Sequence, residues 1–198
     1  TEAAVISLGG VVVHKSARSA GNKIDDCLAQ YVKKKYNLII GERMAEAIKM
    51  TIGDASPNVI PASEPESRQK KEWIPGQARD DRQNSMEVRG RDAITGLPRM
   101  IELTRAQVTE AIMPVLVQII NAVKSVFEET PPELSADIID KGIVMSGGTS
   151  LLRNFDKLMT KMTGVVCHVA EDALLCVVRG TGVAMENIEL YKRSISRR

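Results

Sequence analysis

The chain has 198 residues, of which 43% are hydrophobic and 26% charged, so it is long enough to bury a substantial core. Its formal net charge of +2 does not favour nucleic acid as a partner, since nucleic-acid binding usually needs a concentrated basic patch. The three cysteines have no Cys-X-X-Cys spacing, which favours buried thiols over disulfides or a metal site. No apolar run reaches the ~18 residues of a membrane span, so we expect none.

The first elements predicted are a hairpin and two helices. Residues 3–8 and 11–16 are β-rich runs joined by Gly9 and Gly10, which is typical of a β-hairpin. A helix follows, with Asn22 as its expected N-cap. Its apolar residues recur at helical spacing: Ile24, Cys27, Leu28, Tyr31 and Val32.

A shorter helix is predicted from about Arg43 to Ile52, with Gly53 as the C′ residue at which it stops. Glu46 and Lys49 lie three residues apart on one of its faces. On the residues alone, this spacing favours an exposed ion pair worth a few tenths of a kcal/mol.

Residues 58–84 differ from the rest of the chain. They contain three prolines and the single Trp, and their charges of both signs follow no helical or strand period. The segment resembles translated palindromic repeats that are inserted in frame in proteins of some intracellular bacteria. We expect an inserted, largely disordered loop without chemistry.

Beyond this segment, residues 86–88 and 99–103 predict two strands around the turn at residues 95–98. Thr104 and Gln107 form a capping box at the start of the longest helix, in which Pro114 is expected to cause a kink. Pro131 and Pro132 should end it. Its apolar stripe indicates a core position: Val108, Ile112, Val115, Leu116, Ile119, Val123, Val126 and Phe127.

Residues 142–153 read as a short strand, a Gly147-Gly148 turn and the start of a helix. Such a junction brings backbone N–H groups and a helix N-terminus close to a ligand, which suits a nucleotide. Many α/β proteins make the same turn with nothing bound, so the turn alone leaves both readings open. A helix at about residues 151–162, a strand at residues 165–169 and a helix at about residues 174–191 complete the chain.

Several segments together resemble the MreB family of bacterial actin-like proteins, which bind ATP and form the filaments that set rod shape. The resemblance covers nearly the whole chain apart from about 27 residues in the middle, and it is carried by residues 1–10, 18–25, 36–43, 86–92, 95–98, 131–138, 142–153, 169–172 and 179–182.

The resemblance implies an α/β fold, namely the second lobe of an actin-like ATPase (ribonuclease H-like), with a small α+β subdomain inserted. The larger subdomain would comprise residues 1–37 and 108–198, and the smaller one residues 38–107. The first lobe and the phosphate loops are expected to precede residue 1, so the chain is interpreted as a single-lobe fragment.

The resemblance also implies a site for ATP, accompanied by Mg²⁺ in the complete protein. Glu46, Ala47, Ile48 and Lys49 would line the adenosine side, where the carboxylate accepts ribose hydroxyls and the lysine stem packs on adenine. Gly148, Thr149, Ser150 and Leu151 would face them across a cleft, with a helix N-terminus near Ser150. No catalytic residue and no metal ligand is assigned in this chain.

Thr149 stands where the family has a glycine. A β-branched residue is unfavourable at positive φ, and it adds bulk where the nucleotide should approach. We therefore expect strain at this position.

The implied function is ATP-dependent self-association into filaments in the cytoplasm, beneath the membrane, where they meet the cell-wall elongation machinery and maintain rod shape. The family hydrolyses ATP slowly during polymerisation, whereas this fragment alone is expected to be inactive. Two alternatives stay open: a non-functional gene remnant, and another ATPase of the actin superfold, such as a sugar kinase or an Hsp70-type chaperone.

Overall fold

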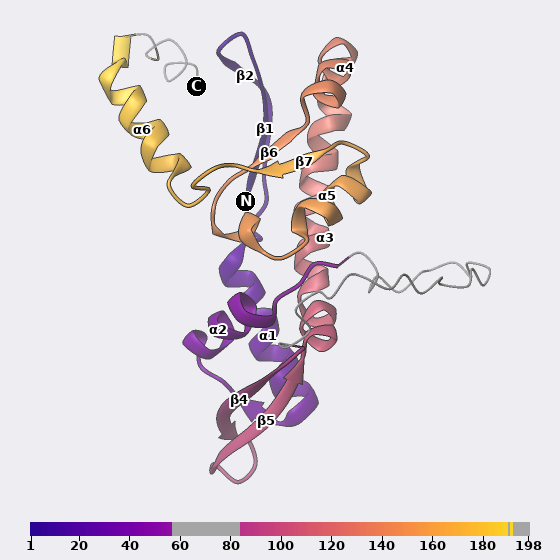
Figure 1. Cartoon of the computed structure of the whole chain (residues 1–198), viewed down its shortest axis with the longest axis vertical. Coiled ribbons are helices and arrows are strands. Elements are labelled where there is room, and N and C mark those ends of the chain that lie inside the picture. Colours follow the sequence, from indigo (N-terminus) through magenta and orange to yellow (C-terminus); the bar gives the residue numbers. More distant parts are fainter. Residues whose placement is uncertain (57–83, 190, 192–198) are drawn as a thin grey trace, which may run out of the picture.

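A single long helix forms the axis of the molecule. The computed structural model describes residues 1–56, 84–189 and 191, and in it α3 (Arg105–Glu129) runs through most of the height of Figure 1. The predicted insertion lies outside the described residues, except for its last residue, Asn84.

Two pairs of strands lie toward one end of α3. β1 (Glu2–Ser7) and β2 (Gly10–Ser16) form the predicted antiparallel hairpin, with Val5 opposite Val13. β6 (Ile143–Met145) and β7 (Cys167–Val169) pair in parallel. Among the described residues these four strands make two separate two-stranded sheets (Figure 1).

The other end of α3 carries two helices and a small sheet. α1 (Gly21–Tyr36) and α2 (Glu42–Ile52) pack on α3 and on each other. β3 (Leu38–Ile39), β4 (Ser85–Asp92) and β5 (Pro98–Thr104) form an antiparallel sheet in that order. Both strands that were predicted after the insertion are therefore confirmed, and both are longer than predicted.

The remaining elements follow α3. They are α4 (Pro132–Lys141), the 3₁₀ turn η3 (Gly148–Leu151), α5 (Phe155–Thr163) and α6 (Cys176–Glu186). The sequence analysis missed α4, where Pro132 occupies the first helical turn, a position that tolerates its missing N–H.

The core forms where α1, α2, α3 and α5 meet. The predicted apolar stripes are confirmed, because Ile24 and Leu28 on α1 and Ile112 and Leu116 on α3 are completely buried. The capping box of Thr104 and Gln107 is also present. Burial of these side chains provides the main free energy of folding, at about 1.5–3 kcal/mol for each fully buried large aliphatic side chain.

α3 has the length and apolar composition that a membrane span requires, in contrast to our expectation from the sequence. The core helix of a water-exposed protein meets the same criterion. Ten residues of α3 are buried, including residues of both its first and its last turns. Its apolar character is thus accounted for by the core.

The predicted cap of α1 is wrong, because α1 begins at Gly21 with Ala20 as its N-cap and no side-chain cap, so Asn22 does not cap it. Gly53 ends α2 as predicted, with a φ of −62°. Glycine is required there for space, because a Cβ would lie 2.1 Å from the carbonyl oxygen of Lys49 and 2.9 Å from Cδ1 of Leu152.

Candidate nucleotide site

Three chain segments converge at Gly21, the first residue of α1. A Cβ placed on Gly21 would lie 3.5 Å from Nζ of Lys49 and 3.6 Å from Oγ1 of Thr149. Lys49 comes from the last turn of α2, and Thr149 comes from η3. The fold thus brings one residue from each side of the predicted cleft to a common point, although they are far apart in the sequence.

Lys49 is held by an ion pair with α1. Its Nζ donates a hydrogen bond to Oδ2 of Asp25 at 2.8 Å, and the two side chains are only 19% and 16% exposed. The pairing of Lys49 with Glu46 that the spacing favoured is therefore wrong. Asp25 on the neighbouring helix α1 is the partner instead, and local sequence spacing does not predict a contact between two helices.

The end of α2 is fixed against the segment that carries η3. Gly53 packs against Leu152, and the Ala55 N–H donates to the carbonyl oxygen of Arg153 at 2.8 Å. Asp54 and Arg153 form an isolated parallel bridge at the same place. These contacts set the position of Lys49 relative to η3.

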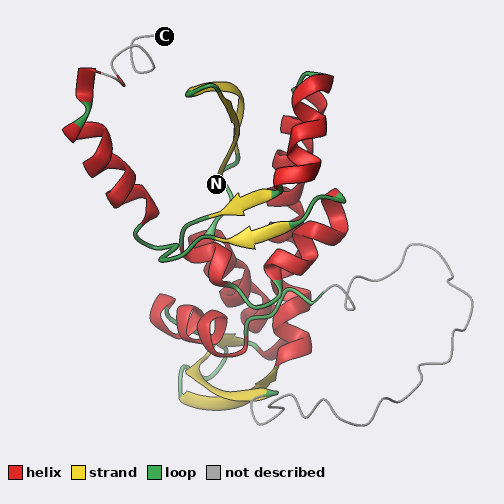
Figure 2. Ribbon diagram, turned by 45° about the horizontal axis from the view of Figure 1, so that its top comes forward, coloured by secondary structure: helices red, strands yellow, loops and turns green. Residues whose placement is uncertain are grey.

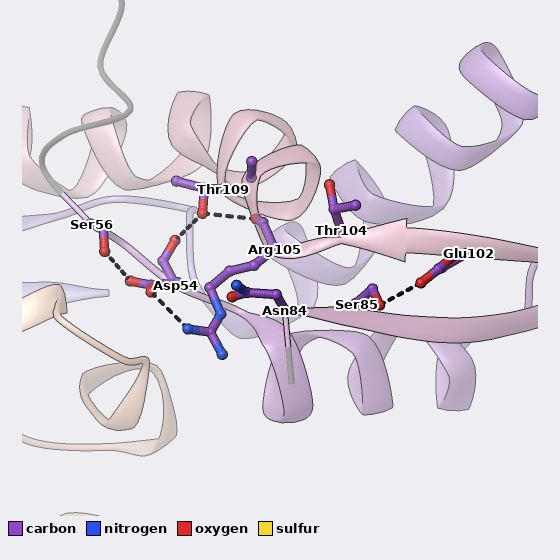
Figure 3. Close-up of a pocket in the computed structure, with 9 residues that line it drawn as sticks. Asp54, Ser56, Asn84, Ser85, Glu102, Thr104, Arg105 and Thr109 are labelled. Atoms are coloured by element: carbon purple, nitrogen blue, oxygen red, sulfur yellow. Dashed lines mark hydrogen bonds and ion pairs between the residues drawn. The ribbon is translucent and has the colours of Figure 1, made fainter. Parts of the chain in front are cut away.

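Asp54 is the centre of this junction, and the sequence analysis did not single it out. It is 4% exposed, and its Oδ1 accepts hydrogen bonds from Oγ of Ser56 at 2.7 Å and Nδ2 of Asn154 at 2.8 Å. Its carbonyl oxygen accepts a bond from Oγ1 of Thr109 on α3 at 2.8 Å. Figure 3 shows Thr109 and Ser56 on either side of Asp54. Asn154 is the one residue here whose type could have indicated a special local structure, because Asn tolerates a positive φ such as its observed 58°.

The predicted residues on α2 differ in their surroundings. Glu46 is exposed, and Ala47 and Lys49 are half-buried. Ile48 is completely buried in the core, so its side chain does not face open solvent. A ligand at this helix would therefore meet the side chains of residues 46, 47 and 49.

On the other side, Gly148 and Leu151 are exposed and Thr149 is half-buried. Ser150 is 4% exposed, and its Oγ donates to the carbonyl oxygen of Gly147 at 2.6 Å. Ser150 therefore stabilises the turn, while its neighbours form the surface.

The expected strain at Thr149 is absent. The left-handed residue of this turn is Gly147, with a φ of 85°, whereas Thr149 lies inside the 3₁₀ turn without a positive φ. The α-helix expected near Ser150 begins only at Phe155. The other expectation for Thr149, added bulk at the site, agrees with the position of its hydroxyl beside Gly21.

The described residues hold no group of three or more His, Cys, Asp or Glu side chains that could bind a metal ion. They do line a cavity of about 520 Å³ near the two ends of the insertion (Figure 3). Asp54, Ser85, Arg105 and Thr109 contribute to it, and Nη1 of Arg105 lies 4.0 Å from Oδ2 of Asp54. None of the predicted site residues lines this cavity.

The fold is that of an actin-like ATPase lobe. The structure of MreB5 from Spiroplasma citri bound to AMPPNP matches with a TM-score of 0.78 and 30% identity, covering 97% of this chain and 51% of that chain. A MamK double helical filament matches with a TM-score of 0.55 at 17% identity, which indicates the fold alone.

Sequence comparison defines the family. The model described as MreB/Mbl protein matches residues 1–64 and 58–193, two segments that meet inside the predicted insertion. The cell shape-determining protein Mbl of Bacillus cereus is 39% identical over 196 residues, covering 98% of this chain and 52% of the relative. The cell shape-determining protein MreB of Escherichia coli K12 is 40% identical over 191 residues, covering 96% and 49%.

The chain belongs to the MreB/Mbl family, and it spans about half the length of the curated relatives it matches. The resemblance seen in the sequence is confirmed. Membership in this family favours a filament protein over the sugar-kinase and chaperone alternatives.

Proposed function

We propose that this chain is a nucleotide-binding lobe of an actin-like filament protein that determines cell shape, and that it binds the adenosine part of ATP between α2 and η3. One observation carries the proposal. Lys49 and Thr149, which the family resemblance assigns to opposite sides of an adenosine cleft, both lie beside Gly21.

In this site the exposed Glu46 carboxylate would accept hydrogen bonds from the ribose hydroxyls. The stem of Lys49 would pack against adenine, because its ammonium group is already directed to Asp25. Gly148 would let the ligand approach the backbone of η3 closely. The solved MreB5 structures of Spiroplasma citri contain AMPPNP or ADP, which supports a nucleotide as the ligand class.

Mg²⁺ would come with the phosphates of ATP in the complete protein. We assign no Mg²⁺ ligand to this chain, and the Asp25 carboxylate is paired with Lys49. The chain's own contribution would therefore be to bind and orient the nucleoside.

At the cellular level, the proposal includes self-association into filaments and contact with the cell-wall elongation machinery at the cytoplasmic side of the membrane. Its support is that the curated relatives are cell shape-determining proteins.

The test of the site is an NMR titration of the full chain with adenosine. We expect weak binding, on the order of millimolar or poorer, because the site has contacts with only part of a nucleotide. Glu46→Ala should weaken it further, and Thr149→Gly should strengthen it by removing bulk beside Gly21.

Gly21→Val provides a blocking variant, since its side chain would occupy the space between Lys49 and Thr149. Gly180→Ala is the matched control, because a Cβ there meets no atom within 4 Å. Loss of binding in the first variant but not in the second supports the site. Equal binding in both, or shifts that are confined to other elements, would refute it.

The remnant alternative has its own test in the DNA upstream of residue 1. A continuous reading frame that encodes the other half of the relatives' length supports a functional protein. A stop codon or a frameshift there would support a gene remnant instead.

A further inference from the structure

The ion pair between Asp25 and Lys49 is unusual in how little freedom it leaves to the lysine. Oδ2 of Asp25 accepts the Lys49 hydrogen bond at 2.8 Å, while Oδ1 is buried and has no hydrogen-bond partner. A carboxylate in this position depends on the ammonium group for its charge compensation. Moving that group away would leave a buried, unpaired charge, which is strongly destabilising.

Asp25 therefore accepts one N–H of the Lys49 ammonium and compensates its charge. Its partner Asp25 comes from the second turn of α1, and Gly21 lies one turn earlier, next to Thr149. The groups beside this point are the Lys49 ammonium, whose charge Asp25 compensates, the Gly21 backbone and the Thr149 hydroxyl, so the point carries no net charge.

We infer that Asp25 is a positioning residue that makes this site selective for the uncharged nucleoside part of a nucleotide and indifferent to its phosphates. This inference rests on the proposed adenosine site. Asp25 acts through Lys49: it neutralises the ammonium and holds the stem in a fixed place for a base to pack on. Adenosine, ADP and ATP should therefore bind the chain equally well.

The experiment compares adenosine and ATP, without divalent metal, in NMR titrations of the full chain at low and at high salt. We expect the two dissociation constants to agree within about twofold and to be independent of salt, since Asp25 compensates the charge of the Lys49 ammonium. This comparison needs no variant, so it does not depend on whether a mutant folds.

Asp25→Asn then tests the residue itself. The amide keeps the shape of the side chain but removes its negative charge. The positive charge of Lys49 is then no longer compensated. ATP should now bind about fivefold more tightly than adenosine, which is the upper range for one exposed charge pair, and high salt should abolish the difference. Asp26→Asn is the matched control, because Asp26 is an exposed neighbour on the same helix and should behave as the unmodified chain.

The outcomes separate this inference from the proposed function. ATP binding about tenfold or more tightly than adenosine to the unmodified chain would overturn the inference and leave the adenosine site standing. An unchanged ratio of the two constants in a folded Asp25→Asn variant would also overturn it. If neither ligand shifts resonances near Gly21, the proposed site is wrong and the inference falls with it.

Discussion

Single polar side chains hold the segments around the candidate site in place. Thr109 is 1% exposed, and its hydroxyl lies 2.8 Å from the Asp54 carbonyl oxygen and 3.0 Å from that of Arg105. The Asp54 bond is the long-range one, because it joins α3 to the end of α2. Buried hydrogen bonds of this kind matter chiefly because leaving a buried acceptor without a donor is costly.

We predict that Thr109→Val lowers the free energy of unfolding by about 1–3 kcal/mol, since Val keeps the shape and removes the donor. Thr181→Val is the control: its hydroxyl bonds to the Val177 carbonyl oxygen, but the side chain is exposed on α6, so the change should stay within about 0.5 kcal/mol. Urea unfolding measures both. Equal losses in the two variants would contradict the role given to Thr109.

At the scale of elements, the turn between β4 and β5 is organised by one carboxylate. The N–H groups of Thr95 and Ile94 donate to Oδ1 of Asp92, and Nη1 of Arg99 donates to Oδ2 at 2.9 Å. The Thr95 N–H, the Arg99 guanidinium and the Ile94 N–H hold the pKa of Asp92 well below its usual range. The turn is thus stabilised by the ionised form.

This shift predicts a pH dependence. Because the folded-state pKa of Asp92 is lowered, its contribution is complete above the unfolded-state pKa of about 3.9 and is lost as the pH falls below that value. Asp92→Asn should therefore lower the urea midpoint at neutral pH, and its difference from the unmodified chain should shrink below about pH 4. A difference that does not change with pH would contradict this account.

The ends of the insertion are both attached to the first turns of α3. At one end, the Arg105 N–H donates to the carbonyl oxygen of Asn84 at 2.8 Å. At the other end, Oγ1 of Thr109 donates to the carbonyl oxygen of Asp54, which lies two residues before Ser56. Lengthening or shortening a loop whose ends are held in this way changes its closure entropy only slowly.

We predict that residues 58–83 can be replaced by a short Gly/Ser bridge without loss of the fold. The thermal midpoint should change by less than about 3 °C, which corresponds to roughly 1 kcal/mol for a chain of this size. Thermal unfolding of the full chain and of the deletion gives the comparison. A drop well beyond that would mean that the segment contributes to the core.

For the molecule as a whole, the outstanding feature is the separation of α6 from the core. No described residue of α6 is buried, and its large apolar side chains include Val177, Val178 and Met185, which are 71%, 69% and 72% exposed. Figure 2 shows the helix apart from the strands and from α3. Its contribution to the stability of this chain is accordingly small.

A chain that ends at Leu175 should therefore unfold within about 2 °C of the full chain, in line with surface changes of about 0.5 kcal/mol. It should also aggregate less, because exposed apolar area is removed. Thermal unfolding and light scattering test the two effects. A midpoint that falls by many degrees would show that α6 packs on the core in solution.

The chain alone should not hydrolyse ATP. Phosphoryl transfer requires a phosphate cradle, a metal ion and a positioned water, whereas the proposed site contacts only the adenosine part of the nucleotide. Phosphate release should match a blank without protein. Release above that blank that is abolished by Lys49→Ala would contradict the prediction.

The sequence by itself determined the local elements and the family. Local patterns in the sequence predict features whose residues are close together in the chain. These features are the apolar stripes of α1 and α3, the β1–β2 hairpin and the Thr104 capping box. α4 was missed because Pro131 and Pro132 were interpreted only as the end of α3, although a proline is also favoured in the first turn of a new helix.

Only the tertiary structure decided which groups meet at the candidate site. Lys49 pairs with Asp25 and not with Glu46 because α1 and α2 pack together. An ion pair between two helices depends on how the helices are placed, and local residue spacing does not encode that placement. The relaxed backbone of Thr149 has a similar origin. Gly147 makes the left-handed turn, Asp54 and Arg153 tie α2 to the segment that follows η3, and Thr149 is thereby placed in a 3₁₀ turn that suits a β-branched residue.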